Sequence, residues 1–186
     1  MADIPASLTS LPESLEDLRR AILAIDAELV ALLGRRAALS LAVGARKQAS
    51  GQSDIFRPSR EAALMRQLEA MSPGPLPIEH LRAIYREILS SSRNLQHPQR
   101  VAFAEPEGSP AHSAGRELLG SLAEFQPKSS LADVFAAVAD GSCELGIVPL
   151  ATTEALKSCS LRHPELHILA ETGCHFAVIG RTPSET

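Results

Sequence analysis

The sequence predicts an all-α N-terminal domain of three helices, which pairs with a second copy into an intertwined helical homodimer, followed by a small α/β domain. Two observations predict this class. Up to Gln96, apolar residues recur every three or four positions, which is typical of amphipathic helices. After Pro98, short β-type segments alternate with a helical one, which is typical of an α/β unit. We therefore expect a lead-in over 1–14, a helical domain over 15–97 and an α/β domain over 98–186.

The first expected helix is unusually long. It begins at Ser14, whose side chain suits an N-cap, and ends near Ser50. These 37 residues would form a rod about 55 Å long, which a small monomer cannot cover along its whole length. A partner chain is therefore expected. The apolar residues follow the three-and-four spacing of a heptad seam: Leu15, Leu18, Ile22, Ile25, Leu29, Leu32, Leu39 and Val43.

Two shorter helices are expected next. The second begins at Pro58, a residue that suits a first helical turn, and continues to about Met71. Prolines and a glycine within 73–77 then predict a turn. A third helix is expected from Ile78 to about Gln96.

The last part of the chain has a different pattern. Arg100 to Phe103 is typical of a short strand. Leu131 to Ala139 predicts a helix, and the runs 144–150 and 175–180 predict two further strands. This alternation predicts the α/β domain.

Composition narrows the classes of function. A net charge of −4 gives no general reason to expect nucleic-acid binding. Cys143, Cys159 and Cys174 are odd in number and lack CxxC spacing, which argues against a disulfide framework and a thiolate zinc site. No signal-peptide pattern is seen, and acidic residues interrupt the most apolar early stretch, 21–33, so we expect a cytoplasmic protein that does not span a membrane.

A charged residue interrupts the seam of the first helix. Arg36 occupies a seam position. It either specifies the register of the paired helices or extends its charged end into water. Alternatively, it binds an anion that enters the seam. Lys47 follows eleven residues later, so the two side chains project within about 20° of each other. Arg19 lies about 25 Å from Arg36 along the helix axis, but in an antiparallel pair it could complete the partner's site.

Polar residues also occupy expected apolar positions of the third helix. Steps of four residues reach Ser92 and Gln96, which is compatible with simple fraying at a helix end. Arg60 and Glu61, at the start of the second helix, are ordinary surface residue types. Taken together with the first helix, however, these positions offer four cations, one carboxylate, one hydroxyl and one amide in an apolar bundle.

With these residues in place, the segment 15–96 resembles the all-helical chorismate mutases, specifically the mutase domain of bifunctional chorismate mutase/prephenate dehydratases. The resemblance implies a homodimeric enzyme that rearranges chorismate to prephenate for phenylalanine and tyrosine biosynthesis and needs no cofactor or metal. The similar segments are Leu18-Arg19-Arg20-Ala21-Ile22 with Ile25-Asp26, Leu32-Leu33-Gly34-Arg35-Arg36, Val43-Gly44-Ala45-Arg46-Lys47, Arg60-Glu61, and Ile88-Leu89-Ser90-Ser91-Ser92 with Gln96.

The resemblance also implies how the substrate carboxylates are held. Arg36 and the partner's Arg19 would bind them, with assistance from Ser92. Arginine suits this role because its planar guanidinium binds a carboxylate through two parallel hydrogen bonds.

The same resemblance implies roles at the reacting bond. Lys47 and Gln96 would bind the ether oxygen, Glu61 would bind the ring hydroxyl, and Arg60 would support the site. Many members of the family have an acidic residue three positions before the Arg-Glu pair, whereas Arg57 stands at that position here. Recognition of the ring hydroxyl is therefore expected to rest on Glu61 and on the backbone.

The C-terminal part resembles a shortened and degenerate prephenate dehydratase. The strands and helix within 100–109, 134–138 and 146–150 follow the order of that family. The expected motif of an acidic residue, an asparagine and a serine or threonine is Ala-Thr-Thr at 151–153, and the catalytic Thr-Arg-Phe motif is Cys-His-Phe at 174–176. The resemblance therefore implies an inactive dehydratase part.

Two further features of this part concern a loop charge and a possible metal site. Glu105 stands where the dehydratase loop usually has a glycine, and it places a negative charge where a dianionic substrate would lie. His112, His175 and the cysteines match no metal-ligand spacing, which favours ordinary loop and core roles.

Other functions stay open at this point. The chain could be a bifunctional chorismate mutase/prephenate dehydratase, or a related lyase that acts on isochorismate. It could also be a noncatalytic dimeric module whose α/β part binds a small molecule or a partner.

Overall fold

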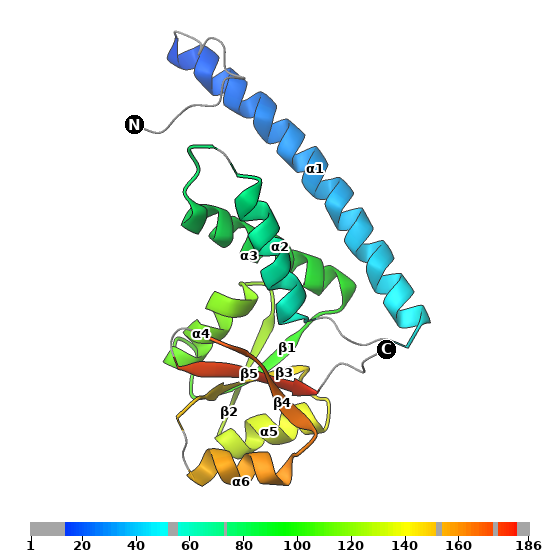
Figure 1. Ribbon diagram of the computed structural model, residues 1–186, viewed down its shortest axis with the longest axis vertical. Helices are drawn as coiled ribbons and strands as arrows, with labels where there is room; N and C mark the ends of the chain where they lie inside the picture. The colour runs from blue at the N-terminus through cyan, green and yellow to red at the C-terminus, as the bar shows by residue number, and fades with distance from the viewer. Residues whose placement is uncertain (1–13, 52–55, 73, 152–153, 173–174, 182–186) are drawn as a thin grey trace.

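The computed structural model describes residues 14–51, 56–72, 74–151, 154–172 and 175–181. Three helices come first, and a five-stranded sheet with three more helices follows (Figure 1). Most of the expected lead-in, as well as Thr152, Thr153 and Cys174, lies outside the described residues. The predicted fold class, a helical part followed by a small α/β part, is confirmed.

Helix α1 spans Leu15–Ala49. Ser14 caps it, because the Ser14 side chain accepts a hydrogen bond from the Asp17 backbone N–H at 3.1 Å. Gly51, just beyond the C-terminal end, has a φ of +70°, a conformation that glycine adopts readily. The helix thus begins and ends where local capping chemistry predicts.

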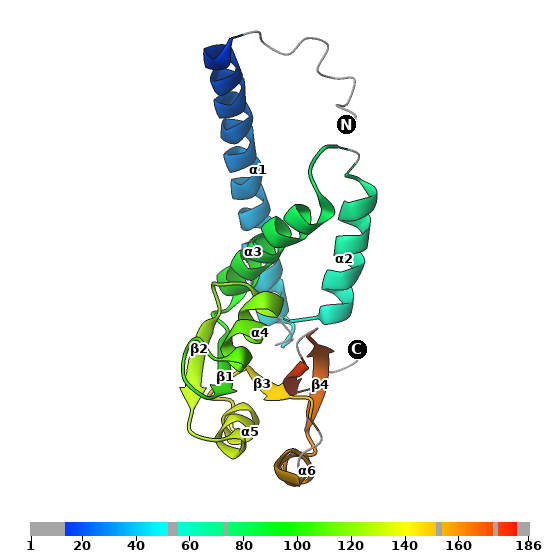
Figure 2. The ribbon, with the colours of Figure 1, turned by 90° about the vertical axis from the view of Figure 1, so that its left-hand side faces the viewer.

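Much of the apolar surface of α1 is exposed within a single chain. Ile22 is 58% exposed, Leu29 is 49% exposed, and Leu39 is 69% exposed. Figures 1 and 2 show why: the N-terminal half of α1 projects beyond the rest of the chain, and only its C-terminal half lies beside α3. Among the described residues, nothing covers this seam of large apolar side chains.

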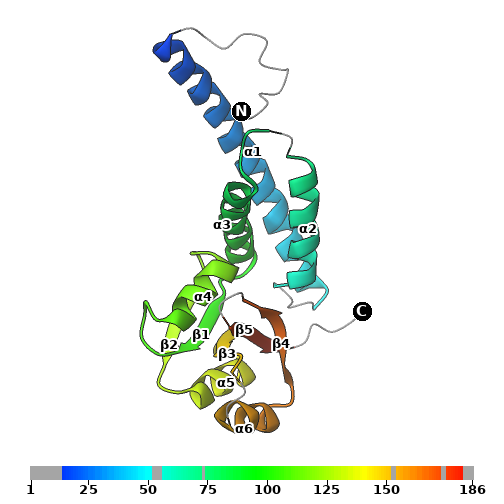
Figure 3. The ribbon, with the colours of Figure 1, turned by 60° about the vertical axis from the view of Figure 1, so that its left-hand side comes forward.

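Helices α2 (Pro58–Ala70) and α3 (Ile78–Gln96) pack against each other, and α3 also packs against α1. Figure 3 shows α2 and α3 side by side along the lower half of α1. The sequence predicts all three helices to within about one residue at each end.

The α/β part contains one mixed sheet with the strand order β2-β1-β3-β5-β4. Strand β1 lies parallel to β2 and β3, and β5 lies antiparallel between β3 and β4. The elements are β1 (Arg100–Ala104), α4 (Pro110–Leu119), β2 (Glu124–Lys128), α5 (Leu131–Ala139), β3 (Leu145–Pro149), α6 (Glu154–Arg162), β4 (Leu166–Glu171) and β5 (Phe176–Arg181).

Side chains from the two faces of the sheet build two apolar clusters, because successive strand residues point to opposite faces. On β1, Val101 and Phe103 join a cluster under α4, whereas Ala102 joins a cluster under α5. Figure 1 shows α4 on one side of the sheet, with α5 and α6 on the other. Both faces of this mixed sheet are therefore covered by helices.

Four elements of this part were not predicted: α4, β2, α6 and β4. Strand β2 contains Pro127, which breaks the sequence pattern but is tolerated because β2 is an edge strand. Helix α4 carries readable signals, since Ser109 caps it and Pro110 occupies its first turn. None of the described helices is both long enough and apolar enough to cross a lipid bilayer.

Candidate functional site

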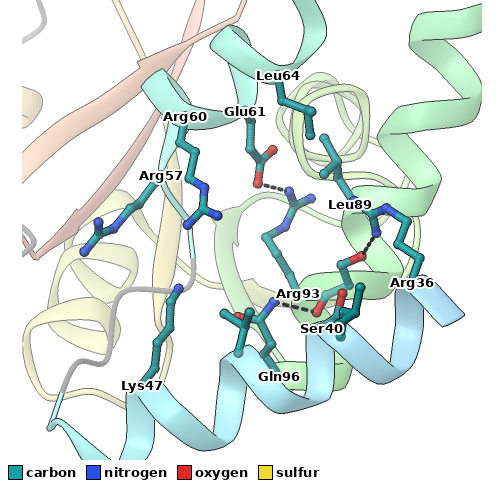
Figure 4. Close-up of a pocket in the computed structure, with 13 residues that line it drawn as sticks. Arg36, Ser40, Lys47, Arg57, Arg60, Glu61, Leu64, Leu89, Arg93 and Gln96 are labelled. Carbon is teal, nitrogen blue, oxygen red and sulfur yellow. Dashed lines mark hydrogen bonds and ion pairs between the residues drawn. The ribbon is translucent and has the colours of Figure 1, made fainter. Parts of the chain in front are cut away.

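A cavity of about 240 Å³ lies between α1, α2 and α3 (Figure 4). Its described walls hold five cationic side chains and a single carboxylate, next to an apolar surface. Such an excess of positive charge in a concave site suits a small anion. The lining residues are Arg36, Leu39, Ser40, Val43, Lys47, Arg57, Arg60, Glu61, Leu64, Leu89, Ser92, Arg93 and Gln96.

Arg36 and Ser92 meet at one end of the cavity. Arg36 is half-buried, and its Nη1 donates a hydrogen bond to the Oγ of Ser92. The Ser92 hydroxyl in turn donates to the Ile88 carbonyl one helical turn earlier, at 2.8 Å. The arginine that interrupts the α1 seam therefore faces α3 from a fixed position, rather than extending into water.

Lys47 and Gln96 come from the C-terminal turns of α1 and α3. The two helices approach closely here because Gly44 has no side chain, and a Cβ at that position would lie only 3.1–3.2 Å from carbon atoms of Gln96. The Gln96 Nε2 donates to the Ser92 carbonyl at 3.1 Å. Among the described residues, no partner is found for the buried Oε1 of Gln96. Figure 4 shows the Lys47 and Gln96 side chains directed into the same space.

Glu61 lies in the first turn of α2, where an acidic side chain is favoured by the helix dipole. Its Oε1 accepts an ion-paired hydrogen bond from Nη1 of Arg93, a residue that is only 4% exposed. Arg93 also donates to Gln99 Oε1 at 3.1 Å and to the Leu119 carbonyl at 2.5 Å. Its guanidinium carbon lies 5.5 Å from the centre of the Phe56 ring. This arginine is thus held on several sides.

Arg57 and Arg60 line the cavity on the α2 side. Arg60 is exposed, and Figure 4 shows its guanidinium turned toward the space between Glu61 and Lys47. Arg57 stands where an acidic residue would be usual in the family that the sequence resembles, so this side of the cavity is more cationic than expected.

Six of the seven predicted site residues line this cavity: Arg36, Lys47, Arg60, Glu61, Ser92 and Gln96. The seventh, Arg19, lies on the projecting half of α1 and is exposed in the single chain. The structure thus brings the six together and leaves Arg19 apart, while the roles predicted for all seven stay predictions.

Sequence reasoning overlooked Arg93 and did not count Arg57 as part of the site. No periodicity marks Arg93, because its partners come from positions 61, 99 and 119, which only the folded chain brings together. Arg57 could have been predicted as a site residue, because it stands three residues before the Arg60-Glu61 pair.

Two residues that the sequence singled out lie after β1: Glu105 is in the loop that follows the strand, and His112 is in the first turn of α4. Glu105 has a φ of +87°, in the left-handed region that favours glycine. The loop after β1 thus has a glycine-type backbone at a position occupied by a charged residue. His112 accepts a hydrogen bond from the Gly108 N–H at 2.9 Å and stacks on Phe103 with ring centres 5.1 Å apart. It therefore has a structural place in the loop and core.

Comparisons with known proteins find similarity to chorismate mutases in the same helical part that forms the cavity. The family described as chorismate mutase type II matches residues 18–97. Among curated relatives, a bifunctional chorismate mutase/prephenate dehydratase of Pseudomonas aeruginosa is 32% identical over 142 residues, which cover 74% of this chain and 39% of the relative. The enzymes of the same description from Aquifex aeolicus and Escherichia coli K12 are 33% and 29% identical, and the aligned residues cover 76% and 83% of this chain and 40% and 45% of those relatives.

The chain therefore spans about two fifths of the length of the curated relatives it matches first. A solved structure of GqqA, described as a novel type of quorum quenching acylase, aligns over 46% of this chain and 49% of that chain. The TM-score of 0.36 and the 22% identity are too low to support a functional conclusion. Residues 18–97 are thus similar to the chorismate mutase type II family, and the aligned relatives carry the same activity in their description.

Proposed function

We propose that this protein catalyses the rearrangement of chorismate to prephenate in the cavity between α1, α2 and α3. One observation carries the proposal: Arg36, Lys47 and Gln96, predicted from the sequence to face one substrate, line one cation-rich cavity. Chorismate is a small dianion, and the charge of this cavity is complementary to it.

In this proposal, arginines hold the two carboxylates of the substrate. Arg36 binds one of them and is oriented by Ser92, with which it already shares a hydrogen bond. The partner's Arg19 binds the other. Fixing both ends favours the compact conformer in which the reacting carbons meet, which removes part of the entropic barrier of a unimolecular rearrangement.

The remaining groups act at the ether oxygen and at the ring. As the C–O bond breaks, negative charge develops on the ether oxygen, and the Lys47 ammonium stabilises that charge more strongly in the transition state than in the ground state. Gln96 donates a second hydrogen bond, because its NH₂ group has two donors and the Ser92 carbonyl accepts one of them. Glu61 binds the ring hydroxyl, and Arg60 supports the site.

A homodimer is part of the proposal. The exposed apolar row of α1 supports it, because large apolar surfaces of this kind are usually covered by a partner. In an antiparallel pair of α1 helices, Arg19 of one protomer approaches the cavity of the other. The test mixes inactive Arg19→Ala and Lys47→Ala protomers, whose hybrid dimers carry one intact site. Absence of any recovered activity after verified subunit exchange contradicts the shared site.

The deciding experiment incubates the purified protein with chorismate and, separately, with isochorismate, and identifies the products by chromatography and mass spectrometry. Prephenate as the product supports the proposal. Stable binding without turnover would favour a noncatalytic small-molecule-binding module, and turnover of isochorismate alone would favour a lyase.

We further propose that the α/β part does not dehydrate prephenate. The altered sequence motifs and the charged Glu105 in a glycine-type loop conformation support this view. Prephenate supplied in excess should therefore persist, and enzymatic formation of phenylpyruvate above the rate without protein would overturn this part of the proposal.

A further inference from the structure

Helix α3 has two polar faces with different neighbours. One face carries Ser92 and Gln96 and lines the cavity. The other face contacts the segment that joins α4 to β2: the Glu87 carboxylate accepts hydrogen bonds from the Ser121 N–H at 3.0 Å and from its Oγ at 2.6 Å. Ser90 Oγ accepts from the Leu122 N–H at 3.2 Å. The helix therefore separates the cavity from the α/β part.

Arg93 is the residue of α3 that contacts both sides. Nη1 binds Glu61 in the cavity, while Nη2 donates to the Leu119 carbonyl at the end of α4. The third donor, Nε, binds Gln99 just before β1. Because a guanidinium is planar and rigid, these three bonds fix its orientation, and the orientation of Glu61 follows.

We propose that Arg93 is a positioning residue of the proposed chorismate mutase site, which holds the Glu61 carboxylate in place and ties it to the α/β part through the Leu119 carbonyl. This inference rests on the proposed function, in which Glu61 binds the ring hydroxyl. Both interactions are compatible, because a carboxylate has two oxygens with about four acceptor positions. Glu61 can bind Arg93 through Oε1 and the substrate through Oε2.

Because the Arg93 guanidinium is buried, it has few possible hydrogen-bond partners. A guanidinium that is 4% exposed has little access to water, so it keeps the acceptors that the fold supplies. The Leu119 carbonyl is fixed in turn, because Gly120 has a φ of +79° and packs so closely that a Cβ there would lie 2.5 Å from the Ser90 Cβ. The α/β part thereby contributes to the geometry of a cavity that it does not line.

The test uses the full-length chain and compares Arg93→Met with Arg86→Met. Arg86 lies two turns earlier on α3 and binds the Glu117 carbonyl, again in α4, but it does not line the cavity. Loss of a partner that orients a functional group typically costs about 10- to 100-fold, so Arg93→Met should lower kcat/KM by that factor. Arg86→Met should leave kcat/KM within about threefold of the wild type, as expected for a residue outside the site.

A double-mutant cycle separates positioning from a general loss of stability. If Arg93 acts through Glu61, Arg93→Met should reduce kcat/KM by less than about threefold in a Glu61→Gln background, because the group being positioned is already altered. An equal reduction in both backgrounds overturns the proposal. Should Arg93→Met fail to fold, Arg93→Lys is decisive: its single ammonium cannot bind Glu61 and the Leu119 carbonyl with the same geometry, so a folded variant with wild-type kcat/KM overturns the proposal as well.

Failure of the proposed function is distinguishable from failure of this inference. A wild-type protein that does not rearrange chorismate overturns the proposed function. The positioning of Glu61 is then judged by hydrogen exchange of the amides in the first turns of α2. Exchange there should be faster in Arg93→Met, or in Arg93→Lys, than in the wild type and in Arg86→Met. Unchanged exchange in the Arg93 variant overturns the positioning of Glu61.

Discussion

Replacement of Lys47 by alanine tests the proposed mechanism most directly. Lys47 is half-buried in the last turn of α1 and lines the cavity beside Gln96. Its ammonium is the group expected to face the ether oxygen as the C–O bond breaks. Truncation removes this charge but leaves the capping of α1 by Ser14 and the Arg36–Ser92 hydrogen bond in place.

The magnitude follows from the partly buried position of the ammonium. Two unit charges 4 Å apart attract each other by about 4 kcal/mol at an effective dielectric constant of about 20, so about half a charge on the oxygen gives about 2 kcal/mol. A hydrogen bond to a charged group adds about 1.5 kcal/mol or more. Together these terms predict a decrease in kcat of about 300-fold, since each 1.36 kcal/mol corresponds to a factor of ten.

The assay follows chorismate consumption under saturating substrate and compares Lys47→Ala with Arg46→Ala. Arg46 is the neighbouring cation on α1 but is exposed and does not line the cavity. We expect the Arg46 variant to stay within about threefold of the wild type, as surface substitutions usually do. Turnover by folded Lys47→Ala at a rate close to that of the wild type would refute the proposed role of the ammonium.

Three further predictions concern packing, backbone strain and acid stability. Gly44→Val should force α3 away from α1, displace Gln96 and lower kcat/KM by at least about tenfold, since overpacking moves the backbone; unchanged kinetics would contradict this close approach. Glu105→Gly should raise the free energy of unfolding by about 0.5–1 kcal/mol in urea titrations, because glycine relieves the cost of a φ of +87°; a destabilised variant would be contrary to the assigned conformation. The Ser121 hydroxyl, together with its backbone N–H, lowers the pKa of Glu87 from its ordinary value of 4.5, so this stabilisation is present above that pH and lost as the pH falls through the lowered pKa. Ser121→Ala should therefore weaken the acid dependence of the urea midpoint, and an unaltered dependence would argue against the Glu87 contact.

Much of the helical part could be read from local sequence features. The bounds of α2 and α3 follow from Pro58, from the turn at 73–77 and from the apolar repeat, all of which act within a few residues. The α/β part was harder to predict. Its short elements, such as β2 with Pro127 as its last residue but one, depend on position at a sheet edge, which no local pattern specifies.

For the site, the sequence by itself determined which side chains share a helix face. Arg36 and Lys47 project together because eleven residues make just over three whole turns of a helix. Their pairing with α3 could be expected only through the resemblance to a family, since helix periodicity does not say which helix lies opposite.

The tertiary structure alone decided the placement of Arg93. Its three polar partners come from α2, from the segment before β1 and from the end of α4, so its burial is stable only when all of these elements are in place. A buried charge depends on its whole surroundings, whereas a helix depends mainly on its neighbours along the chain. Local periodicity therefore specified the helices and the cationic face of α1, and long-range packing specified how the α/β part reaches Glu61.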